Sequence, residues 1–176
     1  MKAPRALVVY YSRTGHTRIV AEALRSALGA DVEEIHDPVE RGGVLGYLRC
    51  GAEALFGASS QIALPRKDPS TYDLVLVGGP VWGTSVSSPI RTYLWLEHDR
   101  LPATALFVTY GGAGSGRALA QMSQLVGKRP VAVLAVREAE TGAAKYEPKL
   151  AAFVEELLER SARPRRRRRS GRPRAA

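Results

Sequence analysis

The stretch "ALVVYYSRTGHTRIVAEAL", residues 6–24, decides the fold of this chain. Its first six residues are apolar without interruption, which is typical of a strand covered on both faces of a parallel sheet. A short polar loop, "SRTGHT", follows, and a helical pattern begins directly after it. This pattern predicts a helix over 17–28, ended by Gly29, with one apolar face formed by Ile19, Val20, Ala23, Leu24, Ala27 and Leu28.

The same alternation of strand and helix continues along the chain. Further strands are predicted over 31–35, 72–78, 103–109 and 130–136. Helices are predicted over 89–96, with proline in the first turn, over 117–126, ended by Gly127, and over 145–160, with Leu150, Phe153, Val154, Leu157 and Leu158 facing inward. Alternating strands and helices imply right-handed crossovers. We therefore expect an α/β fold, doubly wound around a five-stranded parallel sheet with helices on both faces.

The segment 38–64 interrupts this alternation between the second and third strands. Its apolar residues Leu45, Leu48, Ala52 and Leu55 have helical spacing, which predicts an inserted helix. Two interpretations stay open: the helix covers a face of the sheet, or it borders the ligand or a partner subunit.

Length and charge predict one folded domain over 1–162 and a disordered tail over 163–176. The net charge of +9 lies in this tail, "RPRRRRRSGRPRAA", which has eight arginines and no acid. The rest of the chain has 18 basic and 17 acidic residues and is almost neutral. The tail is either solvated without a specific role, or an arm that touches nucleic acid or another acidic surface. The single Cys50, with no visible signal peptide or membrane span, predicts a soluble cytoplasmic protein.

The loop "SRTGHT" carries three hydroxyl side chains, Ser12, Thr14 and Thr17, at the start of a helix. A helix start offers free backbone N–H groups to an anion, and Gly15 allows a ligand to approach closely. This predicts a phosphate site, the alternative being simple helix capping by Ser12 or Thr14. The chain lacks both the Gly-Lys-Ser/Thr triplet of triphosphate loops and a G-x-G-x-x-G sequence after the first strand. What remains is a site for one phosphate group, without metal or lysine.

Two later loops follow the third and fourth predicted strands, so they should reach the same edge of the sheet. In "GGPVWGTSVSSP" (78–89), two glycines and Pro80 predict a turn that places Trp82 at the ligand, although a core position for Trp82 is the alternative. In "TYGGAGSG" (109–116), four glycines expose backbone groups and Tyr110 adds a second aromatic. A flat aromatic mononucleotide suits these three loops together.

The sequences "VVYYSRTGHT", "YDLVLVGGPVWG" and "TYGGAGSG" resemble the flavodoxin family over about residues 5–160. The resemblance implies the strand order 2-1-3-4-5 and non-covalently bound FMN. It places six residues around the phosphate: Ser12, Arg13, Thr14, Gly15, His16 and Thr17. It places Pro80, Val81, Trp82 and Gly83 against the isoalloxazine ring, and Thr109, Gly111, Gly112 and Gly114 along its other edge, with Tyr110 at the same rim.

The resemblance implies a redox function in which the flavin carries the chemistry, so no residue is predicted to be catalytic and no metal is expected. The first hypothesis is an FMN-dependent oxidoreductase that passes electrons from NAD(P)H to a quinone-like or other small acceptor. The second is a non-enzymatic electron carrier between protein partners. Electron-carrier flavodoxins are typically strongly acidic, whereas this body is almost neutral, which favours the enzyme. Because this family often dimerises, a homodimer is a further expectation.

Overall fold

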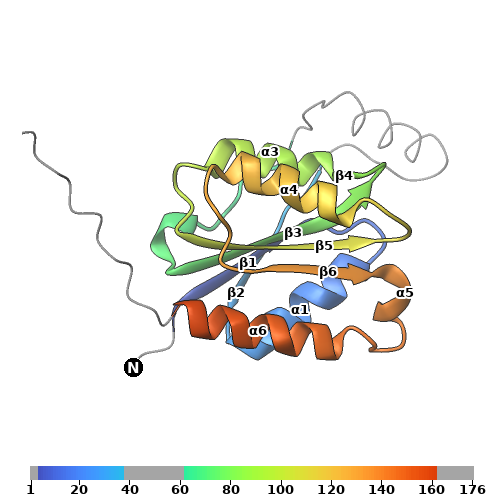
Figure 1. Ribbon diagram of the computed structural model, residues 1–176. Coiled ribbons are helices and arrows are strands. Elements are labelled where there is room, and N and C mark those ends of the chain that lie inside the picture. Colours follow the sequence, from blue (N-terminus) through green and yellow to red (C-terminus); the bar gives the residue numbers. More distant parts are fainter. Residues whose placement is uncertain (1–3, 38–61, 162–176) are drawn as a thin grey trace, which may run out of the picture.

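The computed structural model of the chain describes residues 4–37 and 62–161. A central sheet has helices packed on both of its faces (Figure 1). The strands are β1 (Ala6–Tyr10), β2 (Asp31–Glu34), β3 (Leu74–Trp82), β4 (Ser85–Val86), β5 (Ala103–Tyr110) and β6 (Val133–Arg137). The helices are α1 (His16–Leu28), the 3-10 helix η1 (Pro69–Thr71), α3 (Ser88–Glu97), α4 (Ser115–Val126), α5 (Glu138–Thr141) and α6 (Glu147–Ser161).

The strands are hydrogen-bonded in the order β2-β1-β3-β5-β6, and all of these pairs are parallel. The short β4 lies off this path and pairs antiparallel with the end of β3. Without β4 the order is 2-1-3-4-5, so the predicted fold class is confirmed. Since β1 and β5 both pair with β3 in parallel, the carboxyl ends of the three strands lie at one edge of the sheet.

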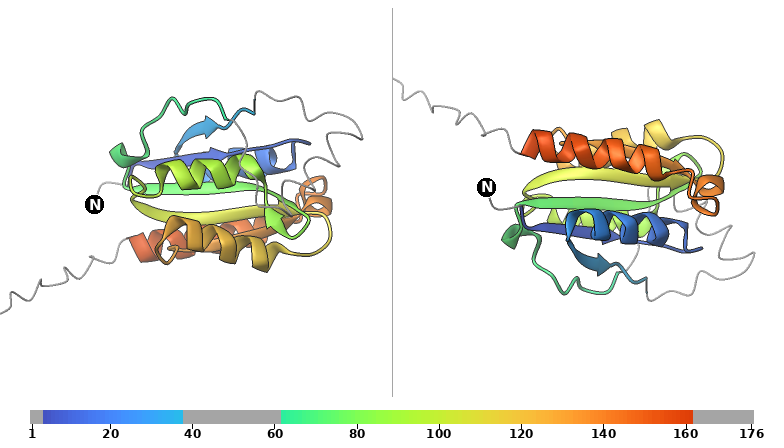
Figure 2. Two further views of the ribbon diagram at one scale, coloured as in Figure 1. Left: turned by 90° about the horizontal axis from the view of Figure 1, so that it is seen from above. Right: turned by 90° about the horizontal axis from the view of Figure 1, so that it is seen from below.

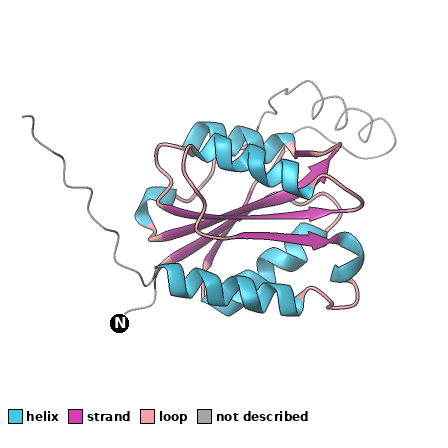
Figure 3. Cartoon of the chain, in the orientation of Figure 1, coloured by secondary structure: helices cyan, strands magenta, loops and turns pink. Residues whose placement is uncertain are grey.

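Neighbouring residues of the central strands enter two different cores, as the alternation of a strand requires. Val8 faces the layer of α1 and α6, whereas Leu7 and Val9 face the layer of α3 and α4. Seen from above, α3 and α4 lie in front of the sheet, and seen from below, α1 and α6 lie in front of it (Figure 2). The two helical layers therefore cover opposite faces of the sheet. Figure 3 shows the same three-layer arrangement by secondary structure. Burial on both faces explains why β1, β3 and β5 are almost uniformly apolar.

Strand β3 continues through Gly79 and Pro80 to Trp82, where the sequence predicted a turn after residue 78. That prediction was wrong, because the two glycines serve packing. A Cβ at Gly78 would overlap the ring of Phe107, and one at Gly79 would lie 2.7 Å from Cγ1 of Ile90. Pro80 is tolerated because β1 ends opposite Gly78, which leaves β3 without a β1 partner at Pro80.

Several smaller predictions need correction. Ile19 of α1 and Leu158 of α6 are 41% and 45% exposed, so the apolar stripes of these helices are wider than the surface that covers them. Helix α5 was not predicted, because four residues are too few for a periodic pattern. As predicted, Gly29 and Gly127 end α1 and α4, and both adopt the left-handed conformation.

The inserted helix expected within 38–64 falls almost wholly outside the described residues, as does the tail. In the part of the chain that the structure describes, no helix is long and apolar enough to cross a membrane.

Candidate functional site

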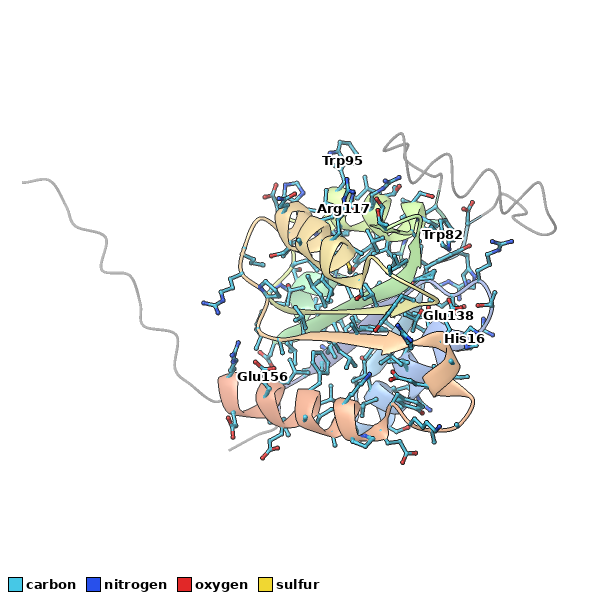
Figure 4. All side chains as sticks on the ribbon, turned by 45° about the vertical axis from the view of Figure 1, so that its right-hand side comes forward. His16, Trp82, Trp95, Arg117, Glu138 and Glu156 are labelled. Carbon is cyan, nitrogen blue, oxygen red and sulfur yellow. The ribbon has the colours of Figure 1, made fainter. Side chains whose placement is uncertain are left out.

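A cavity of about 570 Å³ opens at the carboxyl edge of the sheet. Its wall comes from the loops after β1 and β5, the β3–β4 hairpin and the start of α5. The lining residues are Arg13, Thr14, Pro80, Val81, Trp82, Gly83, Thr84, Gly111, Gly112, Ala113 and Glu138. Figure 4 shows His16, Trp82 and Glu138 at this one end of the molecule, although they come from separate elements. The size is within the range of small-molecule and cofactor pockets.

The predicted site residues divide into two groups. Eight of them line the cavity: Arg13, Thr14, Pro80, Val81, Trp82, Gly83, Gly111 and Gly112. The other seven lie next to these but are not lining residues: Ser12, Gly15, His16, Thr17, Thr109, Tyr110 and Gly114. Their contacts show that several of them hold the three loops together, and their predicted contacts with a cofactor stay predictions.

The first loop ends at Gly15, which has φ +93° and stands immediately before α1. Gly15 has no side chain to cap the helix, so the cap hydrogen bond to the first turn is missing at this position. Ser12 partly replaces it, since its Oγ accepts a hydrogen bond from the Arg18 backbone N–H at 3.2 Å. The exposed hydroxyl of Thr14 lines the cavity beside this helix start. The loop thus keeps the features of an anion site, with Ser12 acting in the capping role.

A buried hydroxyl pair joins the first and third loops. Thr17 Oγ1 and Thr109 Oγ1 are 2.7 Å apart, and the two residues are 2% and 0% exposed. The two hydroxyls share one hydrogen bond, in which either can be the donor, at a place where water has no access. These two residues therefore tie the start of α1 to the end of β5 beneath the cavity.

His16 makes a second tie across the site. Its Nδ1 lies 2.7 Å from Thr141 Oγ1, and the Thr141 hydroxyl donates to the Glu138 backbone carbonyl at 2.7 Å. Because a hydroxyl has one hydrogen, Thr141 must accept from His16, which places a hydrogen on Nδ1. The chain of hydrogen bonds connects α1 with α5.

Trp82, the last residue of β3, forms the second wall. Its ring packs edge-on against Tyr11, with centroids 5.7 Å apart and an interplanar angle of 89°. Trp82 is partly buried and also lines the cavity, so it is neither a pure core residue nor a free loop residue. This edge-on contact with Tyr11 stabilises the observed orientation of the indole.

The tip of the β3–β4 hairpin is a two-residue turn, Gly83 and Thr84, with φ values of +54° and +76°. Positive φ at both positions is typical of a type I′ turn, but a β-branched residue is strained there. Thr84 lines the cavity and also touches the third loop: a Cβ at Gly114 would lie 2.6 Å from Thr84 Cα. Gly114, with φ +95°, is thus needed for the close approach of two walls.

Sequence reasoning missed three lining residues, Thr84, Ala113 and Glu138. Thr84 and Ala113 lie within the loops that had been singled out. Glu138 directly follows β6 and adds the acidic group that the first loop lacks. The rule that ligands bind at the carboxyl ends of parallel strands could have found it.

Tyr110 stands at the rim of the site, at the end of β5. The Arg137 guanidinium lies 5.9 Å from the centroid of the half-buried Tyr110 ring, which holds the rim of the third loop. Within residues 4–37 and 62–161, no group of three or more His, Cys, Asp or Glu side chains is placed to hold a metal ion.

Comparison with solved structures identifies the architecture. A flavoprotein from Lactobacillus acidophilus NCFM, solved in complex with FMN, superposes with a TM-score of 0.67 at 23% identity, over 82% of this chain and 99% of its own. The chain has the flavodoxin-like fold. A Streptococcus pneumoniae TIGR4 flavodoxin gives a TM-score of 0.55 at 15% identity, covering 88% of this chain and 97% of its own. The apo form of an NADH:FMN oxidoreductase (EMOB) gives 0.52 at 18% identity, covering 91% of this chain and 92% of its own.

No protein-family model matches the sequence, and no curated protein matches it either. At such identities the likeness establishes the flavodoxin-like fold alone.

Proposed function

We propose that this flavodoxin-like protein binds FMN non-covalently and uses it for redox chemistry. The observation that carries the proposal is the cavity itself: one helix start whose N-cap residue, Gly15, has no side chain, one indole and one glycine-rich loop meet around about 570 Å³. The helix start suits the phosphate of FMN, and the indole and the glycine-rich loop suit its flat ring system. The structural likeness to a flavoprotein solved with FMN supports this choice of ligand.

Different residues of the cavity would hold the phosphate and the ring system of FMN. Arg13, Thr14 and the first N–H groups of α1 would hold the phosphate, because they offer charge-assisted hydrogen bonds at a positive helix end. Trp82 and the backbone of Gly111 and Gly112 would hold the ring from two sides. Bound flavin supplies reversible transfer of electrons, and the chain positions it and tunes its potential.

We further propose that the protein is an oxidoreductase that accepts electrons from NAD(P)H and passes them to a quinone-like or other small acceptor. The almost neutral body favours a small-molecule acceptor over docking on a basic protein. The fold likeness to an NADH:FMN oxidoreductase supports the same choice. A cytoplasmic location, a homodimer and a tail that contacts acidic surfaces are secondary parts of this proposal.

The second candidate is a carrier of electrons between proteins, which the likeness to a flavodoxin favours. Anaerobic titration with NADH and NADPH, followed by addition of a quinone, separates the two candidates. If the protein is an oxidoreductase, one of the nucleotides should bleach the flavin absorbance, and the quinone should rapidly restore it. A bound flavin that neither nucleotide reduces, but that a reductase protein reduces, would make the protein a carrier.

Cofactor binding is tested first, by titrating apoprotein with FMN and following the quenching of flavin fluorescence. Thr14→Ala should weaken binding by about 1–3 kcal/mol, the size of a lost hydrogen bond to a charged group. Thr71→Ala is the matched control, since Thr71 lies in η1, before β3 and so at the opposite edge of the sheet. Absence of FMN binding to the wild-type protein would refute the proposed function.

A further inference from the structure

Glu138 stands out among the eleven residues that line the cavity, because it is the one with a carboxylate. It is the first residue of α5 and is partly buried. Its Oε2 lies 3.7 Å from the position that a Cβ on Gly111 would take, so the acid stands against the third loop. A carboxylate repels a ligand that carries a phosphate, so its place in this cavity is unexpected for a site that only binds the ligand.

The backbone that carries Glu138 is fixed from two directions. The Glu138 carbonyl accepts the Thr141 hydroxyl, which in turn accepts from His16 Nδ1, each at 2.7 Å. Just before it, the Arg137 backbone N–H donates to Glu140 Oε2 at 2.9 Å, closing the first turn of α5. Glu138 is therefore held at the cavity by α1 and by its own helix, and it is not a side chain on a loose surface loop.

Among the described residues, neither an ion pair nor a side-chain hydrogen bond occupies the Glu138 carboxylate, although nearby Glu140 is paired with Lys149 at 2.6 Å. Within the described part of the chain, no cationic side chain therefore lies at ion-pair distance from the Glu138 carboxylate. Inside a partly solvent-excluded cavity, such a charge acts on the occupant more strongly than it would in water. It raises the free energy of any state of the ligand that has gained negative charge.

From this geometry we infer that Glu138 is a potential-setting residue: its charge weakens the binding of reduced, anionic FMN relative to oxidised FMN and so makes the bound cofactor a stronger reductant. The inference rests on the proposed function, since it needs FMN in the cavity. It assigns opposite electrostatic roles to the two charged lining residues, with Arg13 favouring negative charge and Glu138 opposing it. His16 and Thr141 are positioning residues that act through α5.

The test compares the dissociation constants of reduced and oxidised FMN, measured anaerobically on the apoprotein of the full chain. Glu138→Gln removes the charge and keeps the shape. For this variant, the dissociation constant of reduced FMN divided by that of oxidised FMN should fall by roughly threefold to tenfold. This is the size of effect expected when one unit charge is removed from the wall of the cavity. A tenfold fall corresponds to a rise of about 30 mV in the two-electron potential. The effect should shrink at high ionic strength.

Two variants separate charge from structure. Glu138→Asp keeps the charge and should keep most of the wild-type ratio. Glu156→Gln makes the same chemical change in α6, at the far end of the molecule from Glu138 (Figure 4), and should leave the ratio unchanged. A variant that only damaged the fold would weaken the binding of oxidised and reduced FMN equally and so leave the ratio unchanged.

The outcomes discriminate between the two proposals. If the wild-type apoprotein binds no FMN, the proposed function and this inference both fail. If it binds FMN and Glu138→Gln leaves the ratio at the wild-type value, only the role of Glu138 is overturned.

Discussion

The buried pair of Thr17 and Thr109 offers the sharpest test of how the cavity is held together. The two hydroxyls are 2.7 Å apart and almost completely buried, and each is the other's partner. Changing Thr17 to Val keeps the shape of the side chain but leaves the Thr109 hydroxyl unsatisfied. A buried polar group without a partner costs about 1–3 kcal/mol. We expect Thr17→Val and Thr109→Val each to lower the free energy of unfolding by about 1–2 kcal/mol.

The double variant distinguishes a hydrogen bond from simple loss of packing. With both hydroxyls replaced by methyl groups, no orphaned group remains, and the site becomes an apolar contact. The double variant should therefore be more stable than the sum of the single effects predicts, with a coupling energy of about 1 kcal/mol. Urea unfolding of all four proteins without FMN gives the cycle. Strict additivity would refute the proposed pairing.

The same variants test the role that the sequence assigned to Thr17. If its hydroxyl contacts the phosphate of FMN, Thr17→Val should lose more FMN affinity than Thr109→Val does. If it only ties the loops together, the two variants should lose affinity equally.

Four further predictions concern other parts of the structure. Gly114→Ala should lower the free energy of unfolding by about 2–4 kcal/mol and should also weaken FMN binding, because Gly114 has a φ of +95° and closely approaches Thr84. An unchanged midpoint of urea unfolding would contradict this. Tyr93→Phe should stabilise the protein by up to about 1 kcal/mol, since the buried Tyr93 hydroxyl has no partner among the described residues, and a loss of stability would reveal one. Burial raises the pKa of Tyr93, so above pH about 10 the unfolded chain loses this proton first, and wild-type stability should fall with rising pH more steeply than that of Tyr93→Phe. Trp82→Ala should weaken FMN binding and leave less quenching of flavin fluorescence, whereas Trp95→Ala, an exposed tryptophan on α3, should do neither.

The sequence by itself determined the order and type of the main elements. Continuous apolar runs such as "ALVVY" are typical of strands buried on both faces, and their alternation with amphipathic helices favours a parallel doubly wound sheet. Three loops at one edge followed from that topology, and with them the eight predicted residues that line the cavity.

Only the tertiary structure decided what each loop residue touches. Gly78 and Gly79 look like a turn in the sequence, but the close approach of Phe107 and Ile90 makes them part of β3. The partner of Thr17 is 92 residues away, and no local pattern indicates it. Glu138 reaches the cavity because β6 lies beside β5, which brings its carboxyl end to the third loop. Long-range contacts of this kind depend on the packing of the whole sheet, which the periodicity of a single segment does not contain.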